Sequence, residues 1–135
     1  MKRFLIITVV IGLFGGCVSV STFIQNNRMN LAKLSYGMPK EQVNEIMGQE
    51  TVHSANNPYR TAMFMSSEGV QIEVFYYWTD VGRYGVGPLG VPHVSGIVTD
   101  DELTPVVFNN GKVVGWGREF WNDYSKKFEL TVKQR

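Results

Sequence analysis

Apolar and polar positions alternate at the start of the stretch 70–78, where Val70, Ile72 and Val74 share one face, and a second stretch, 59–65, precedes it. Both stretches are rich in β-branched and aromatic side chains, which is typical of β-strands. The four residues between them, "SSEG" at 66–69, have the length and composition of a tight turn. We therefore expect the two stretches to pair as an antiparallel hairpin.

A second hairpin is predicted in the segment "LTPVVFNNGKVVGWG", residues 103–117. Asn110 and Gly111 both accept positive φ, so this dipeptide is a strong signal for a two-residue turn. The turn joins the strand residues 105–109 to 112–116. Pro105 cannot donate to a β-ladder, which places it in an edge strand or at the start of a strand.

The chain before these strands shows helical spacing. Asn26 or Asn27 is suited to cap a helix, and Gly37 is suited to end it. Residues with helical spacing between these points are Met29, Leu31, Ala32 and Leu34. A short helix of about three turns is therefore expected from Asn26 onward, stable only when it packs on another element.

A second short helix is predicted in "MPKEQVNEIMG", residues 38–48. Pro39 fits a first helical turn because its missing N–H would be unpaired there. An apolar face is formed by Val43, Ile46 and Met47, and Gly48 ends the helix.

The C-terminal segment is ambiguous, because Phe120, Trp121 and Tyr124 fit a helical face whereas the residues after them alternate like a strand. We favour a short helix over 118–127, followed by a polar end. Helices that come first and strands that follow predict the α+β class. Two short helices would pack on one face of a three- to four-stranded antiparallel sheet, within one domain over 26–135.

Residues 1–16 have the pattern of an export signal, with Lys2 and Arg3 before an apolar run. The run is shorter than the roughly 20 residues that a membrane-spanning helix needs. Gly15 and Gly16 stand directly before Cys17, and "FGGC" resembles the bacterial lipobox, in which the cysteine is acylated and becomes the new N-terminus. The alternatives are an uncleaved anchor, or a plain signal peptide beside a chance cysteine.

Cleavage between Gly16 and Cys17 would leave residues 17–25 as a lipidated tether. In enterobacterial-type sorting, aspartate after the cysteine retains a lipoprotein in the inner membrane. Val18 stands at that position here, and the resemblance therefore implies the outer membrane, on its periplasmic side. One cysteine also excludes an intramolecular disulfide.

The charge balance argues against nucleic acid as a partner. The formal net charge is +1, and two of the positive charges lie in the first three residues. The rest of the chain is close to neutral, whereas nucleic-acid binding needs a clustered basic face.

A long glycine-rich segment, residues 79–102, separates the two hairpins. Its motif at 85–90 matches G-x-G-x-x-G, but prolines and the lack of a following helical pattern argue against a nucleotide site. We expect a surface loop there. Its length and composition make residues 82–96 a candidate contact region, with Arg83, Tyr84, Leu89 and His93 as its candidate interaction residues.

The other candidate chemistry is weak. Neither His53 nor His93 has the spacing of a metal ligand, and the acids 100–102 lack the ligand spacing of a calcium loop. No nucleophile motif is present, although a paired-carboxylate site stays open because that pairing is spatial. We expect no catalytic residue, no metal and no cofactor.

The aromatic residues have two interpretations. Trp78, Trp116, Phe120, Trp121 and Tyr124 are either core residues or a binding patch. Three tryptophans in a small domain are hard to bury completely. We therefore keep Trp116, Trp121 and Tyr124 as a candidate aromatic patch for a partner or the membrane interface.

The segment "LSYGMPKEQVNEIMGQE", residues 34–50, resembles a motif of the SmpA/OmlA group of small outer-membrane lipoproteins, which includes BamE. The matching residues are Leu34, Gly37, Met38, Gln42, Val43, Met47 and Gly48. This resemblance implies two helices packed on an antiparallel sheet, a fold shared by β-lactamase-inhibitor protein repeats. The hairpin 103–117 is similar to one in an uncharacterised lipoprotein family of that fold. Pro39 departs from the motif, which has threonine there.

These features predict a non-enzymatic lipoprotein, anchored through acyl chains on Cys17, that binds an envelope protein as an interaction or scaffold module in cell-envelope assembly or maintenance. The alternative is an inhibitor-like binder that blocks an envelope enzyme through an open sheet face. A third possibility is an envelope hydrolase or small-ligand carrier, which would need a deep pocket with a histidine and acids.

Overall fold

The computed structural model describes residues 19–49, 51–52, 55–81, 98–128 and 131–132. The helices are α1 (Val20–Leu31), α2 (Lys40–Met47), the 3₁₀ turn η1 (Asp100–Glu102) and α3 (Arg118–Lys127). The strands are β1 (Thr51–Val52), β2 (Ala55–Asn56), β3 (Arg60–Met65), β4 (Gln71–Trp78), β5 (Leu103–Asn109), β6 (Lys112–Trp116) and β7 (Thr131–Val132). The α+β class is confirmed.

The main sheet has the order β6-β5-β4-β3-β7, and each pair of neighbours is antiparallel. The four longer strands are the ones that the sequence predicts. Two-residue β7 adds to the outer edge of β3, opposite Phe64 and Met65. A small separate hairpin, β1–β2, precedes β3 and was not predicted.

The β5–β6 hairpin has the predicted turn, with φ of 50° at Asn110 and 73° at Gly111. Pro105 does not lie in an edge strand, because β5 runs between β4 and β6. It lies near the start of β5, before Val106, the first residue paired with β6. Its missing N–H therefore breaks no bond of the β5–β6 ladder.

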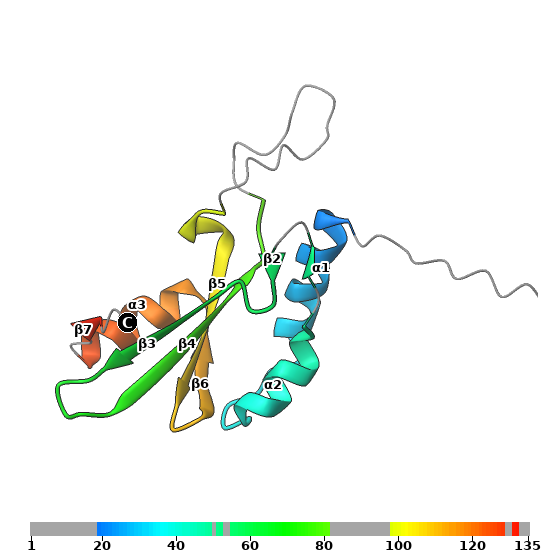
Figure 1. The fold of residues 1–135 in the computed structure, drawn as a ribbon. Helices are drawn as coiled ribbons and strands as arrows, with labels where there is room; N and C mark the ends of the chain where they lie inside the picture. The colour runs from blue at the N-terminus through cyan, green and yellow to red at the C-terminus, as the bar shows by residue number, and fades with distance from the viewer. Residues whose placement is uncertain (1–18, 50, 53–54, 82–97, 129–130, 133–135) are drawn as a thin grey trace, which may run out of the picture.

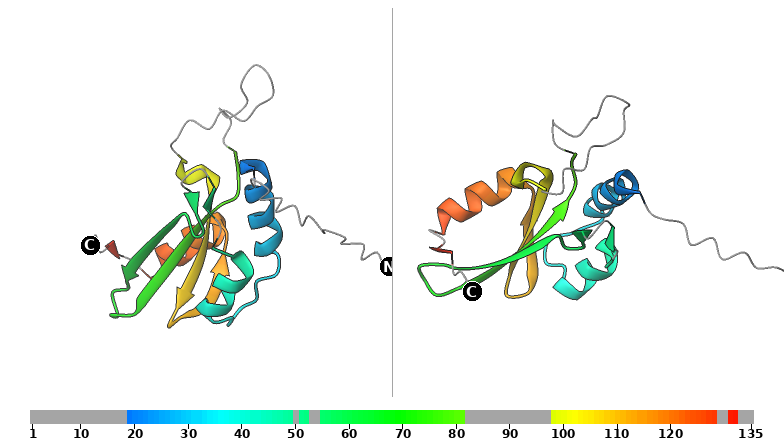
Figure 2. Two further views of the ribbon diagram at one scale, coloured as in Figure 1. Left: turned by 45° about the vertical axis from the view of Figure 1, so that its right-hand side comes forward. Right: turned by 45° about the horizontal axis from the view of Figure 1, so that its top comes forward.

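Helices cover both faces of the sheet (Figures 1 and 2). Helices α1 and α2 lie on one side, and α3 lies on the other. Alternate residues of β4 consequently enter two clusters. Phe75 and Tyr77 pack with Val43 and Met47 of α2. The other face of β4 belongs to a cluster that reaches both the start of α1 and the aromatic face of α3, with members Ile72, Val74, Tyr76, Trp78, Phe23, Phe120, Trp121 and Tyr124.

Helix α1 begins at Val20, earlier than the predicted start at Asn26 or Asn27. The Ser19 side chain accepts a hydrogen bond from the backbone N–H of Thr22 and supplies the cap. Residues 20–25, assigned to the tether from sequence, are therefore folded. The physical reason is tertiary, because Phe23 and Ile24 are buried in the core and hold the first turns in place.

Helix α2 follows a short link whose backbone joins the sheet. Gly48 ends it with φ of 73°, as predicted, whereas Pro39 is not in the first turn but is the extended residue just before it. Gly37 does not end α1, which stops at Leu31. It forms a turn with φ of 77°, and its N–H donates to the Val113 carbonyl at 2.7 Å.

The link continues this pairing, because the Val113 N–H donates to the Met38 carbonyl at 2.9 Å. Pro39 also forms a bridge with Lys112. Residues 37–39 therefore occupy the outer edge of β6 at this point.

Helix α3 confirms the predicted helix over 118–127. It packs closely on the sheet at Gly115, where an added Cβ would lie 2.4 Å from the Phe120 ring. Only glycine leaves room for that ring. The Phe64 and Trp121 rings also meet, with centroids 4.8 Å apart.

Candidate interaction surface

Several residues singled out from the sequence lie outside the described part of the chain. These are the cleavage and acylation residues Gly16 and Cys17, and the loop residues Arg83, Tyr84, Leu89 and His93. His53 and the glycine motif at 85–90 also lie there. The predictions made for them stay predictions.

The predicted aromatic patch does not form one surface. Trp116 is the last residue of β6 and packs with the cluster beneath α2. Trp121 and Tyr124 belong to α3, on the opposite face of the sheet. Gly117 directs the chain from β6 to that face, and the change of side cannot be read from spacing along the sequence. All three side chains are half-buried.

The acidic residues 100–102 form η1, before β5. Asp100 pairs with Arg60 at 3.0 Å, and Asp101 pairs with Arg118 at 3.1 Å. Glu102 completes a capping box with Thr99. These contacts give the cluster a structural role in joining the start of β5 to β3 and α3.

The described residues were compared with the requirements of a metal site and of a membrane-spanning helix. They contain no group of three or more His, Cys, Asp or Glu side chains placed to hold a metal ion. No helix in the same part of the chain is long and apolar enough to span a membrane.

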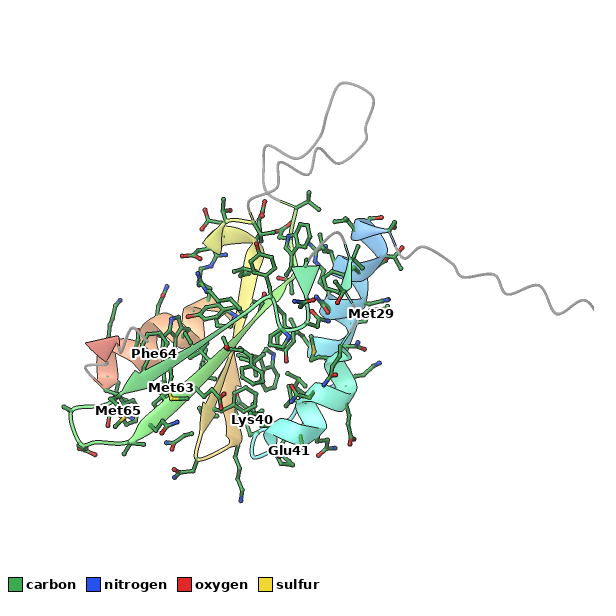
Figure 3. The ribbon with its side chains drawn as sticks, viewed as in Figure 1. Met29, Lys40, Glu41, Met63, Phe64 and Met65 are labelled. Atoms are coloured by element: carbon green, nitrogen blue, oxygen red, sulfur yellow. The ribbon has the colours of Figure 1, made fainter. Side chains whose placement is uncertain are left out.

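The sheet faces offer little open area to a partner. The side of β3 and β4 that α2 leaves uncovered carries Thr61, Met63 and Met65, and Figure 3 labels the two methionines. Met63 is 40% exposed. Lys40 of α2 reaches over this side to Glu73 at 2.8 Å. The described residues of this strip include no exposed aromatic side chain, which the inhibitor-like alternative would favour.

One aromatic side chain is nevertheless strongly exposed. Tyr36, in the link between α1 and α2, is 74% exposed, and its ring lies against Trp116 with centroids 5.4 Å apart. The turn at Gly37 positions Tyr36, because the Gly37 N–H is bonded to Val113 of β6. Two aromatic rings from distant parts of the chain thus meet at the sheet edge.

A shallow, open groove lies beside the Tyr36 ring. It is lined by Tyr36, Gly37, Asn109, Asn110, Lys112, Val113 and Val114. We call this groove together with Trp116 the Tyr36–Trp116 surface. Among the described residues that line it, Lys112 is an exposed cation and the one charged residue, and none carries a carboxylate. Asn109 borders the groove, but its side chain is directed to α3, where its amide donates to the Tyr124 hydroxyl at 3.4 Å.

Tyr36 was not singled out from the sequence. The local signal was the neighbouring glycine, which marks a turn and therefore an exposed position. What makes the position distinctive is the contact with Trp116, and that contact depends on the pairing of residues 37–39 with β6.

The comparison with protein families identifies this domain at the level of family. The sequence profile of a family of proteins of unknown function, DUF3192, matches residues 22–123. This chain belongs to the DUF3192 family. No curated protein and no solved structure matches it. The DUF3192 match begins in the first turn of α1 and ends in α3, so it includes every residue of the Tyr36–Trp116 surface.

Proposed function

We propose that this DUF3192 protein is a non-enzymatic lipoprotein, anchored to the periplasmic side of the outer membrane, that binds an envelope protein through the Tyr36–Trp116 surface. The observation that carries the proposed interaction is the exposed Tyr36 ring, which lies tilted against Trp116 beside a groove. The proposed lipid anchor rests on the signal-like residues 1–16 and the lipobox-like "FGGC" that ends at Cys17.

The chemistry of the surface supports a protein partner. Tyrosine and tryptophan are enriched among the residues that dominate binding energy, because each offers a large apolar area and a polar group. Trp116 is already half-buried and rests on the core, so little of its freedom would be lost on binding. The pair therefore offers a partly ordered site for an apolar side chain.

The charges define the partner further. Lys112 is the charged lining residue of the groove, and its side chain is exposed. Nearby Lys40 is already paired with Glu73. A complementary partner segment would present a carboxylate to Lys112 and an apolar or aromatic side chain to Tyr36.

Photo-crosslinking in intact cells tests the proposed binding of an envelope protein. A photoreactive amino acid at Tyr36 should capture one defined envelope protein. The matched site is Met29, which is 54% exposed on the outer side of α1 (Figure 3) and should not capture it. Lys112→Glu should reduce the product several-fold through charge repulsion, whereas Lys126→Glu on α3 should leave it unchanged.

Equal capture at Tyr36 and Met29, or a product indifferent to Lys112→Glu, would exclude this surface. Deletion of residues 83–92 tests whether the partner binds the Tyr36–Trp116 surface or the contact region predicted in the glycine-rich loop. The Tyr36 product should survive that deletion, and its loss would assign the contact to the loop.

In the same cells Cys17→Ser should release the protein from membranes, and undiminished membrane retention of the processed form would exclude a lipid anchor.

A further inference from the structure

The folded domain begins very close to the predicted lipid attachment point. Ser19 caps α1, and the Phe23 N–H donates to the Ser19 carbonyl at 2.9 Å. Val20, the first residue of the helix, is only 6% exposed. The chain is therefore fixed to the core from residue 19 or 20 onward.

Covalent geometry limits the distance between anchor and domain. Consecutive Cα atoms are about 3.8 Å apart, so the two peptide units from Cys17 to Ser19 span at most about 8 Å. This reach is less than half the length of α1, whose 12 residues extend about 18 Å. An acylated Cys17 would therefore hold the start of α1 at the lipid headgroups.

Other elements gather at the same end of the molecule. Figures 1 and 2 show the start of α1, the end of β4 and η1 together at this end. Arg28 of α1 pairs with Asp80, just after β4, at 3.1 Å. The β3–β4 turn, the β5–β6 turn and the link between α1 and α2 lie toward the opposite end.

We propose that the membrane-proximal end of this protein comprises the first turn of α1, η1 and residues 79–81, and that the Tyr36–Trp116 surface faces away from the bilayer. The inference deepens the proposed function and rests on its lipid anchor. The bilayer that holds the acyl chains is the surface this end meets, and the short spacer determines the orientation.

The charges at this end indicate that the short spacer, and not electrostatic adsorption to lipid, determines the orientation of the domain. Its cations are already engaged, because Arg28, Arg60 and Arg118 pair with Asp80, Asp100 and Asp101 respectively. The exposed residues at the start of α1 are the cap Ser19 and the first-turn residues Ser21 and Thr22, which carry hydroxyl groups. Among the described residues, this surface has no unpaired basic cluster to attract anionic lipid, so orientation should be insensitive to salt.

Fluorescence quenching on vesicles tests the orientation. The acylated mature protein would carry an environment-sensitive fluorophore on one added cysteine, at Ser21→Cys near the membrane or at Ser67→Cys in the β3–β4 turn. Both serines are exposed, so the substitutions are matched. On phosphatidylcholine vesicles with a nitroxide on some lipid headgroups, quenching at residue 21 should exceed quenching at residue 67 several-fold.

A variant with a longer spacer tests whether the short spacer causes the orientation. Insertion of a ~10-residue Gly/Ser segment between Val18 and Ser19 adds about 18 Å of average reach. The difference in quenching between the two labels should then largely disappear, and circular dichroism would confirm that the fold is kept. A difference that persists with the long spacer would overturn the tether as its cause.

Vesicle flotation tests the lipid anchor independently of the orientation. Failure of the acylated protein to float with vesicles would contradict the lipid anchor itself. Flotation with equal quenching at residues 21 and 67 would leave the anchor standing and overturn only the orientation.

Discussion

Tyr77 lies in the cluster beneath α2, where its side chain is completely buried. Its hydroxyl group has no hydrogen-bond partner among the described residues. Burial raises the pKa of Tyr77 well above its ordinary value of 10.0, because the phenolate would lose its hydration. The neutral hydroxyl is tolerated here, but it contributes no bond to offset its own desolvation.

Tyr77→Phe should therefore raise the free energy of unfolding by about 1 kcal/mol at neutral pH, by removing an unpaired buried polar group. The gain should grow as pH rises above 10. There the unfolded wild-type chain releases the Tyr77 proton while the folded chain retains it, which favours unfolding. Urea unfolding across this pH range measures the effect.

Tyr36→Phe is the matched control, since it removes a hydroxyl from an exposed ring. A Tyr77→Phe variant less stable than wild type would show that the hydroxyl is hydrogen-bonded in solution. Parallel stability curves for wild type and Tyr77→Phe above pH 10 would contradict the raised pKa.

At the scale of elements, one side chain caps the start of α1, beside the burial of Phe23 and Ile24. Ser19 Oγ accepts the Thr22 N–H at 3.2 Å, one of the helix-start donors that lack a partner within the helix. The first turn has no acidic residue to interact favourably with the helix dipole, so this cap stands without that support.

Ser19→Ala should lower the free energy of unfolding by about 1 kcal/mol, the usual cost of losing such a cap. Gln25→Ala provides the comparison within the same helix, because Gln25 is exposed and lies beyond the first turn, whereas the Ser21 hydroxyl contacts the Ser19 hydroxyl at 2.9 Å. Hydrogen exchange should show faster exchange of the first-turn amides in Ser19→Ala alone. Equal stability of the two variants would show that burial of Phe23 and Ile24 holds the turn without the cap.

Elements with complete local signals were predictable. The Asn110-Gly111 turn, the strands beside it and the aromatic face of α3 each follow from residues close together in the sequence. The start of α1 was placed too late because its decisive feature is the burial of Phe23 against Trp78, with ring centroids 6.4 Å apart. A contact across so many residues leaves no local pattern.

The candidate site was less predictable for the same reason. Trp116 was identified as a candidate patch residue, but its exposed partner Tyr36 was not. The two rings meet because a link between helices pairs with a strand far along the chain. The assignment of Trp121 and Tyr124 to the same patch was wrong because α3 packs on the other sheet face.

At the scale of the whole molecule, one buried pair of amides joins four segments. Asn27 of α1 and Asn57 exchange hydrogen bonds, with Nδ2–Oδ1 distances of 3.1 and 2.6 Å. Asn27 also donates to the Trp78 carbonyl at the end of β4, and Asn57 donates to the Met47 carbonyl at the end of α2. The pair therefore sets how the helices dock on the sheet.

Asn27→Ala should lower the free energy of unfolding by about 2–3 kcal/mol, because it leaves buried polar groups of Asn57 and Trp78 without partners. Asn26→Ala, at the neighbouring half-buried position, should change it by about 0.5 kcal/mol or less. Thermal unfolding of both variants provides the comparison. Similar losses in the two would mean that the amide pair adds little beyond helix packing.

The pairing of residues 37–39 with β6 has a consequence for crowding. Edge strands with free backbone groups are templates on which neighbouring chains add strands and polymerise. Here the backbone N–H and carbonyl of Val113 are already bonded to the link between the helices. At high local concentration, neighbouring copies of the domain would find that stretch of edge occupied, so crowding does not open a route to strand-by-strand aggregation through it.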